Sequence, residues 1–246
     1  MSEAADIRPE RGGPQVIPRP QEWRPGPGAD WAASDRRPGR IRVDDVRAAL
    51  EARGEPPDRV VSRQVPVVAL PGPGRRPAAV LCVLFAEAVN GVDQAHVVLT
   101  RRSSRLRSHT HQVSFPGGRL DDGETPEQAA RREAREEVGI DPATVEIIGR
   151  LPSLTTVINP APITPFIGVV PGRPVLIANP AEVERAFTVP LVELMDPEVY
   201  RQELWTFPDG SEVAMEFFEL IGDTVWGATA RMLYELLELV VPVALG

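Results

Sequence analysis

Apolar and β-branched residues gather in two runs in the first half of the chain, at 78–86 and 95–100. The dipeptide Asn90-Gly91 lies between the runs, and it is typical of the two-residue turn of a β-hairpin. Further runs at 65–70, 145–151 and 163–170 predict single strands. The runs 204–207 and 213–220 predict a second hairpin around Asp209-Gly210.

Helical periodicity predicts three helices, over 43–53, 126–138 and about 226–240, and short helical turns over 182–187 and 192–195. Residues 106–119 predict a polar, glycine-containing loop. The strands do not alternate regularly with helices. The chain therefore predicts an α/β fold in which helices flank a mixed β-sheet.

Residues 1–40 are rich in Pro, Arg, Gly and Asp and show little apolar periodicity. This composition predicts a disordered or loosely packed N-terminal tail. Trp23 and Trp31 are exceptions and are expected to pack onto the domain as isolated anchors. We expect one domain over 41–246, with its core at about 60–240.

The chain of 246 residues has a formal net charge of -8 and an isoelectric point near 5.1, and all its basic residues are arginine. This balance argues against a protein that coats nucleic acid or a membrane surface. The only cysteine, Cys82, lies in an apolar run, so a disulfide framework is excluded and a small buried hydrophobe is expected. No apolar stretch has the length of a membrane span, and the N-terminus is too polar for a secretory signal, so we expect a cytoplasmic protein.

The helix predicted over 126–138 carries the candidate chemistry. Thr125 and Gln128 form a capping box around Pro126, and Gly139 suits the helix end. Glu133 and Glu137 lie four residues apart, beside an apolar seam, and Glu136 lies one step further round. Clustered carboxylates repel one another, and Mg²⁺ or Mn²⁺ would relieve that repulsion. The alternative is a solvated helix in which arginines at 131, 132 and 135 neutralise the glutamates.

The wider spacing favours the metal site. Gly118 is followed after five residues by Glu124, and after seven more by the run Arg132-Glu-Ala-Arg-Glu-Glu-Val-Gly-Ile140. This pattern resembles the Nudix box, with every fixed position present. The resemblance implies an α/β/α sandwich with a mixed sheet, and a hydrolase that cleaves diphosphate linkages.

The resemblance also implies roles for individual residues. Glu133, Glu136 and Glu137 would hold Mg²⁺ or Mn²⁺, helped by the carbonyl of Gly117, and the expected catalytic residues are Glu136, Glu133, Arg132 and Glu124. One of these glutamates, or another outside the box, would activate the attacking water. Arg132 would orient the glutamates by ion pairing. The glycines at 117 and 118 are expected to let the chain turn tightly beside the metal.

The segment before the box resembles the coenzyme A pyrophosphatase branch. The matching residues, expected to bind substrate, are Arg102, Ser103, Arg107 and Phe115. Guanidinium groups suit coenzyme A, which carries a 3'-phosphate besides its diphosphate. His111 departs from the pattern, which has glycine there. Residues 179–183 and 225–230 also resemble this branch; Glu182 in the first of them is interpreted as a cap or loop residue, with a metal-proximal role as the alternative.

Three functions follow from these patterns. The first is hydrolysis of coenzyme A or its thioesters to 3',5'-ADP and 4'-phosphopantetheine or its acyl form. The second keeps the mechanism but acts on ADP-ribose or another nucleoside diphosphate derivative. The third is a binding module that senses a nucleotide without cutting it. In each, the partner is a small nucleotide-derived molecule, with no nucleic acid or membrane; the oligomeric state stays open, a homodimer included.

Overall fold

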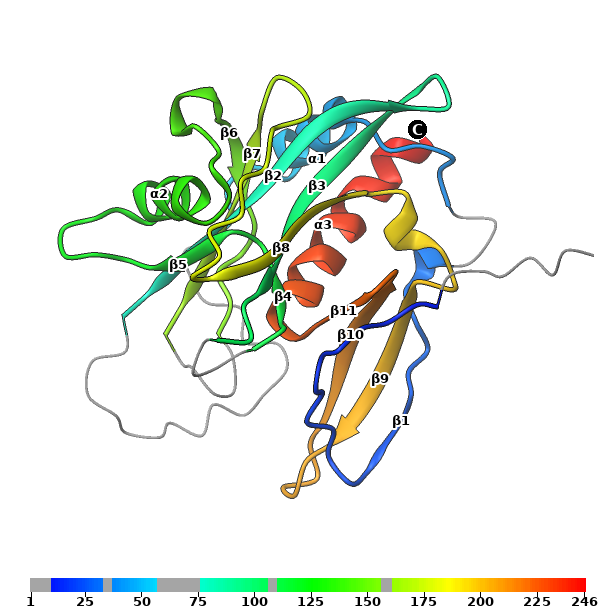
Figure 1. The fold of residues 1–246 in the computed structure, drawn as a ribbon. Helices are drawn as coiled ribbons and strands as arrows, with labels where there is room; N and C mark the ends of the chain where they lie inside the picture. Colours follow the sequence, from blue (N-terminus) through cyan, green and yellow to red (C-terminus); the bar gives the residue numbers. More distant parts are fainter. Residues whose placement is uncertain (1–9, 33–36, 57–75, 106–109, 156–160) are drawn as a thin grey trace, which may run out of the picture.

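The computed structural model describes residues 10–32, 37–56, 76–105, 110–155 and 161–246. Within these residues a seven-stranded sheet forms the centre of the molecule (Figure 1). Its main path has the order β4-β3-β2-β7-β6, while β5 pairs with β2 and β8 pairs with β3. The strands are β2 (Ala78–Val89), β3 (Val92–Arg102), β4 (Val113–Ser114), β5 (Gly117–Arg119), β6 (Glu146–Arg150), β7 (Ile163–Val169) and β8 (Val183–Pro190).

The predicted mixed sheet is confirmed, because β2 runs parallel to β7 and antiparallel to β3 and β5. The predicted turn between β2 and β3 is also confirmed. Asn90 and Gly91 both have positive φ angles, of 53° and 77°, which fits the twist of a two-residue hairpin.

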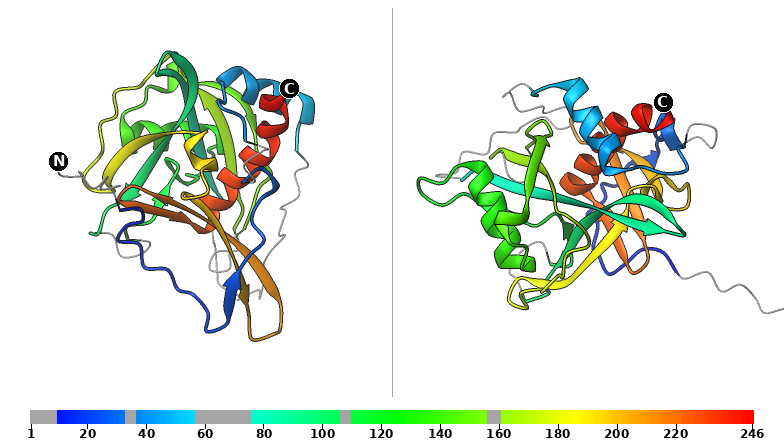
Figure 2. Two further views of the ribbon diagram at one scale, coloured as in Figure 1. Left: turned by 90° about the vertical axis from the view of Figure 1, so that its right-hand side faces the viewer. Right: turned by 90° about the horizontal axis from the view of Figure 1, so that it is seen from above.

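Helices cover both faces of this sheet (Figures 1 and 2). Helix α2 (Pro126–Val138) lies on one face, while α1 (Val43–Arg53) and α3 (Gly227–Leu245) lie on the other. Strand β2 is buried on both sides: Leu81 and Phe85 pack toward α2, and Cys82 and Leu84 belong to the larger core with α1 and α3. This burial explains why its sequence is a continuous apolar run rather than an alternating one.

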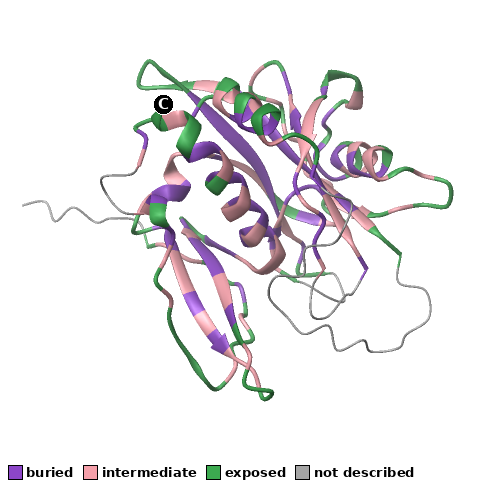
Figure 3. Cartoon of the chain, turned by 180° about the vertical axis from the view of Figure 1, so that it is seen from behind, coloured by how far each residue is buried: buried purple, intermediate pink, exposed green. Residues whose placement is uncertain are grey.

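A second, four-stranded sheet packs beside α3, in the order β1-β9-β10-β11. Its strands are β1 (Trp23–Pro25), β9 (Tyr200–Thr206), β10 (Glu212–Leu220) and β11 (Asp223–Trp226). Figure 3 shows that buried residues gather where this sheet, α3 and the central sheet meet. Three short 3-10 helices, at Asp30–Ala32, Pro142–Thr144 and Glu193–Met195, connect the described elements.

The structure corrects the prediction of a loose N-terminal tail for the residues that it describes. Strand β1 pairs with β9, and Trp31 is buried against Tyr200, with ring centroids 4.6 Å apart. Trp31 is therefore the predicted anchor, whereas Trp23 is about half exposed. Polar pairs such as Gln15 with Asp223 and Arg19 with Glu203 also attach the segment, and such pairs leave no apolar periodicity in the sequence.

Two other predictions change. Residues 183–190, expected to begin in a helical turn, form strand β8 against β3. The loop expected over 106–119 contains the short strands β4 and β5. The strand expected at 65–70 lies outside the described residues.

Cys82 is fully buried in β2, and this burial raises the pKa of its thiol. A buried, protonated thiol is a poor nucleophile, so Cys82 acts as a small core residue. Among the described residues, no helix is long and apolar enough to span a bilayer.

Candidate active site

Helix α2 carries all three glutamates predicted to bind metal, and its ends are fixed by local sequence. The Thr125 side chain accepts a hydrogen bond from the Gln128 amide, and the Gln128 side chain accepts one from the Thr125 amide. Gly139 ends the helix in the left-handed conformation, with a φ of 74°. Ala130, Ala134 and Val138 are completely buried against the sheet. This packing turns one edge of the helix, with its glutamates, toward β5.

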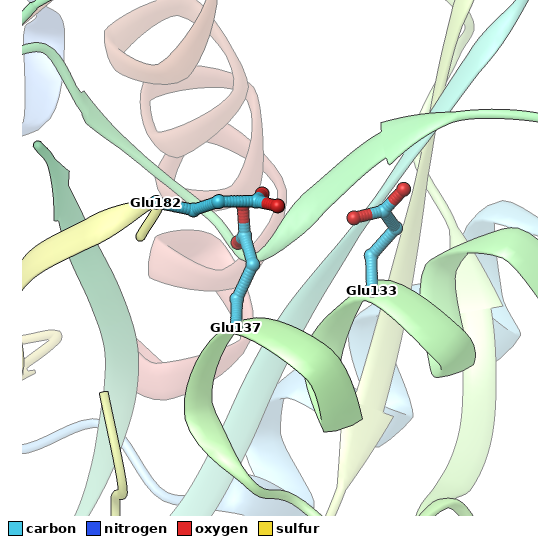
Figure 4. A group of neighbouring side chains, drawn as sticks. All are labelled: Glu133, Glu137 and Glu182. Atoms are coloured by element: carbon cyan, nitrogen blue, oxygen red, sulfur yellow. The ribbon is translucent and has the colours of Figure 1, made fainter. Parts of the chain in front are cut away.

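Three carboxylates meet at this edge (Figure 4). Glu133 and Glu137 project from successive turns of α2, and Glu182 approaches from the residue before β8. One oxygen from each of the three lies within 4.8 Å of the others. We call these three residues the carboxylate group. Three hard oxygen donors at this separation form a set that suits Mg²⁺ or Mn²⁺.

The electrostatics of this carboxylate group favour a bound cation. Burial, together with the nearby Glu133 and Glu182, raises the pKa of Glu137 to about 7 against the opposing effects of the Gly117 amide and Arg102. Burial also raises the pKa of Glu133. Ionised carboxylates are thus disfavoured here without a counter-charge, and a divalent ion would supply one. The donor set and its electrostatics both fit the metal that the sequence predicted.

Arg132 holds the acidic residues around it in fixed positions. Its Nε and Nη2 donate to the two oxygens of Glu124, at 2.9 and 3.0 Å, and its Nη1 donates to Glu133 at 2.9 Å and to Glu136 at 3.1 Å. Its Nη2 also donates to the carbonyl of Arg119 in β5. Pairing with Arg132 lowers the pKa of Glu124, so Glu124 remains ionised. Arg132 therefore ties α2 to the loop that precedes it.

Glu136 is placed differently from Glu133 and Glu137. It is exposed, pairs with Arg132, and lies outside the carboxylate group. The structure thus brings together Glu133, Glu137 and Glu182 rather than the three glutamates that were predicted to bind metal. A metal-binding or catalytic role for Glu136 stays a prediction.

Gly117 and Gly118 matter because of space, not because of a tight turn. Neither has a positive φ angle, and both lie in strand β5. A Cβ atom on Gly118 would lie 2.5 Å from the carboxylate carbon of Glu133, and one on Gly117 would lie 2.5 Å from the carbonyl oxygen of Ala79. The Gly117 amide donates to Glu137 at 3.2 Å. These contacts need the close approach that only glycine permits.

Comparison with known proteins identifies the family of the chain. The NUDIX domain profile matches residues 75–207, which include β2 to β8 and the whole carboxylate group. The chain belongs to the Nudix family. It is 38% identical to the uncharacterized Nudix hydrolase NudL of Citrobacter koseri over 164 residues, which are 66% of this chain and 81% of that protein. It is 36% identical to Nudix hydrolase 3 of Caenorhabditis elegans over 169 residues, 63% of this chain and 70% of that protein.

Solved structures resemble it more distantly. A Nudix hydrolase from M. smegmatis, RenU, has 23% identity and a TM-score of 0.42, over 49% of this chain and 73% of that one. A MutT/nudix family protein from Enterococcus faecalis has 17% identity and a TM-score of 0.43, over 70% and 65%.

Family membership fixes the general chemistry. The chain is a Nudix hydrolase that acts on pyrophosphate bonds, with the α/β/α sandwich and mixed sheet of the family. Nudix hydrolases generally need a divalent ion such as Mg²⁺ or Mn²⁺. The carboxylate group is where this Nudix hydrolase can hold such an ion.

The predicted substrate residues have different places in the Nudix domain. Arg102 lies beside the carboxylate group, with its Nη1 3.8 Å from Oε1 of Glu137. Ser103 is buried, and its amide donates to the carbonyl of Glu182 at 2.8 Å, so it positions the backbone of Glu182. Phe115 is only 1% exposed and packs in the larger core, and its contact with substrate stays a prediction. Arg107 lies outside the described residues.

Glu182 is the candidate site residue that sequence reasoning undervalued. The structure places it in the carboxylate group and not at a helix cap. The short helical turn expected over 182–187 hid the strand that follows. The available signal was a lone acidic residue in a segment that resembles the same branch as the segment before the box.

Proposed function

We propose that this Nudix hydrolase cleaves the diphosphate linkage of coenzyme A or its thioesters, giving 3',5'-ADP and 4'-phosphopantetheine or its acyl form. The observation that carries the proposal is the place of Arg102. It belongs to the upstream pattern that resembles coenzyme A pyrophosphatases, and its guanidinium lies 3.8 Å from Glu137 at the carboxylate group. An arginine in this position can contact a phosphate of a substrate that binds at the carboxylate group.

The residues divide the work in a simple way. Glu133, Glu137 and Glu182 would hold one or more Mg²⁺ or Mn²⁺ ions. When bound, such an ion offsets the negative charge of the diphosphate and of the oxygen that leaves. Arg132 and Glu124 keep Glu133 in place, and Arg102 binds a phosphate oxygen.

The reaction consumes one water molecule. The water oxygen forms a bond to one phosphorus, and the bond from that phosphorus to the bridging oxygen breaks. The water gives up a proton, and both products leave as phosphate monoesters. Glu133 is a better candidate than Glu136 to accept that proton, because Glu133 belongs to the carboxylate group and Glu136 is held outside it by Arg132.

Two arginines are the reason why we propose coenzyme A rather than a smaller diphosphate as the substrate. Coenzyme A carries a 3'-phosphate in addition to its diphosphate, and guanidinium groups bind phosphate through two hydrogen bonds at once. We assign Arg102 to the diphosphate because of its position, and Arg107 to the 3'-phosphate because of its place in the sequence pattern. Ser103 contributes by holding the Glu182 backbone.

The decisive experiment compares substrates under both metals. Turnover of coenzyme A, acetyl-coenzyme A, ADP-ribose and NADH is measured with Mg²⁺ and with Mn²⁺, and the products are identified by mass. The proposal expects the highest kcat/KM for coenzyme A or its thioester, with 3',5'-ADP as one product. A higher kcat/KM for ADP-ribose would replace coenzyme A as the substrate. Binding of coenzyme A without cleavage under either metal would favour a sensing module.

A further inference from the structure

Five polar residues next to the backbone of Arg102 form a closed ring of hydrogen bonds and ion pairs. The Gln15 Nε2 donates to the carbonyl of His111 at 2.8 Å and to Oδ1 of Asp223 at 2.9 Å. Arg101 donates to the same Asp223 oxygen at 3.1 Å and to Glu184 at 3.3 Å. The other oxygen of Glu184 lies 3.1 Å from Nδ1 of His111, which closes the ring. These five residues, which we call the polar ring, are Gln15, Arg101, His111, Glu184 and Asp223.

The polar ring joins parts of the chain that are distant in sequence. Arg101 lies in β3, Glu184 in β8 and Asp223 in β11, while Gln15 comes from the N-terminal segment that Figure 1 shows in dark blue beside β11. Gln15 and Asp223 are buried, and Asp223 has no exposed surface. Arg185 also donates to Asp223, at 2.9 Å, and the Thr224 amide donates to Gln15 at 2.8 Å. Both polar atoms of the Gln15 side chain and both carboxylate oxygens of Asp223 are therefore paired, and paired buried groups hold their neighbours firmly.

His111 has a backbone conformation that its side chain does not favour. Its φ angle is 60°, in the left-handed region where glycine is usual and other residues are uncommon. Three contacts hold it there: its carbonyl accepts from Gln15, its ring pairs with Glu184, and its amide donates to the carbonyl of Arg102 at 3.2 Å. The polar ring therefore holds His111 in a backbone conformation that glycine would adopt freely.

The contact with Arg102 links the polar ring to the active site. The Arg102 carbonyl accepts from His111, and the Arg102 amide donates to the carbonyl of Gln112 at 2.9 Å. A register irregularity between β3 and β8 falls between Arg101 and Arg102. Arg101 reaches Asp223 while Arg102 reaches Glu137, so the two adjacent guanidinium groups serve the polar ring and the carboxylate group separately.

We propose that Gln15 and His111 are positioning residues, through which the N-terminal segment fixes the backbone of Arg102 for substrate binding. The inference rests on the proposed function, because Arg102 is given its substrate role there. Neither residue touches the carboxylate group. Their loss is therefore expected to act on substrate affinity rather than on the chemical step.

The first test replaces Gln15 in the full-length protein. Gln15→Ala is expected to raise KM about fivefold or more with kcat within about twofold, as losing the three hydrogen bonds of the Gln15 side chain implies. Gln21→Ala is the matched control, because Gln21 is exposed in the same segment, and it is expected to behave as wild type. Combining Gln15→Ala with Arg102→Ala is expected to raise KM no further than Arg102→Ala alone. An unchanged KM in Gln15→Ala, an equal rise in the control, or full additivity would overturn the proposal.

The second test asks whether the left-handed backbone conformation of residue 111 matters for substrate binding. In the Gln15→Ala background, His111→Gly is expected to bring KM back toward wild type, because glycine adopts a positive φ freely. His111→Ala in that background is expected to leave KM high. Both changes remove the imidazole, so only their tolerance of the left-handed conformation differs. Equal KM values in the two double variants would overturn the assignment of His111.

A third measurement is independent of substrate. Hydrogen–deuterium exchange of the amides at 110–115 is expected to be faster in Gln15→Ala than in wild type and Gln21→Ala, without any nucleotide. If wild type fails to cleave coenzyme A, the proposed function fails, whereas this exchange still tests the polar ring. Unchanged exchange in Gln15→Ala would show that the polar ring does not hold the loop.

Discussion

The backbone amide of Ser103 donates a 2.8 Å hydrogen bond to the carbonyl of Glu182. This bond ties the end of β3 to the residue before β8, just where Glu182 turns its carboxylate toward Glu133 and Glu137. Arg102 ends β3 and contacts the site through its side chain, whereas the next residue, Ser103, contacts it through its backbone. The carboxylate group is consequently completed by a strand pairing and not by the Nudix box alone.

Replacing Glu182 tests that conclusion. Glu182→Gln removes one of the three proposed carboxylate ligands and is expected to weaken Mn²⁺ binding about 10-fold to 100-fold and to lower kcat, with an unchanged circular dichroism spectrum. Mn²⁺ titration followed by electron paramagnetic resonance measures the affinity. Glu212→Gln is the control, because Glu212 forms only an exposed pair with Arg24. Wild-type metal affinity in Glu182→Gln would remove Glu182 from the ligand set.

Glu137 makes the stability of the metal-free protein depend on pH. Its folded pKa of about 7 lies above its ordinary value of 4.5, so folded Glu137 keeps a proton that the unfolded chain loses between these values. Its contribution to stability is therefore complete below pH 4.5 and declines as the pH rises to about 7. The loss is at most about 3 kcal/mol. Bound Mg²⁺ is expected to reverse it, because the ion stabilises the ionised form.

Thermal unfolding across this pH range, with Mg²⁺ or with a chelator, checks this prediction. Glu137→Gln is expected to flatten the decline in the metal-free protein, to respond less to Mg²⁺ at pH 8, and to lose turnover. The comparison between variant and wild type cancels the titration of the other carboxylates. A wild-type decline in Glu137→Gln, or wild-type activity, would contradict its assignment as a ligand.

Helix α2 was predictable from sequence because its signals are local. Thr125, Pro126 and Gly139 mark its ends by contacts within a few residues, and the structure has the predicted bounds Pro126–Val138. The hairpin at Asn90-Gly91 was predictable for the same reason. Two of the three carboxylates lie on α2, so most of the site followed from one segment.

The remainder depends on contacts between distant segments. A short helical turn was predicted over 182–187, yet pairing with β3 makes 183–190 a strand. The N-terminal segment lacks apolar periodicity because polar pairs hold it, such as Gln15 with Asp223 and Arg19 with Glu203. Such pairs have no periodic signature, so composition alone suggested a loose tail.

Arg107 tests the choice of substrate. If Arg107 binds the 3'-phosphate, Arg107→Ala is expected to raise KM for coenzyme A about tenfold or more and to leave KM for 3'-dephospho-coenzyme A nearly unchanged. Arg102→Ala is the matched comparison and is expected to raise KM for both, because Arg102 is assigned to the diphosphate. Steady-state kinetics on both compounds measure the difference. Equal effects of Arg107→Ala on the two substrates would remove it from 3'-phosphate recognition.

The two adjacent glycines of β5 separate effects on stability from effects on activity. An alanine Cβ at Gly118 meets the end of the Glu133 side chain, which can move away. Gly118→Ala is therefore expected to change the free energy of unfolding by less than about 1 kcal/mol while lowering kcat at least about tenfold, because Glu133 leaves its place in the carboxylate group. An alanine Cβ at Gly117 meets the backbone of Ala79 and Val80 in β2, which cannot move without disturbing the sheet.

Gly117→Ala is accordingly expected to lower the free energy of unfolding by about 2 kcal/mol or more. Urea unfolding and initial rates, measured on both variants in the same buffer with saturating Mg²⁺, check the contrast. The decisive comparison is Gly118→Ala, because its fold is expected to survive. If that variant kept wild-type kcat and wild-type metal affinity, the exact position of the Glu133 carboxylate would not matter to catalysis, and its place in the site would have to be given to another residue.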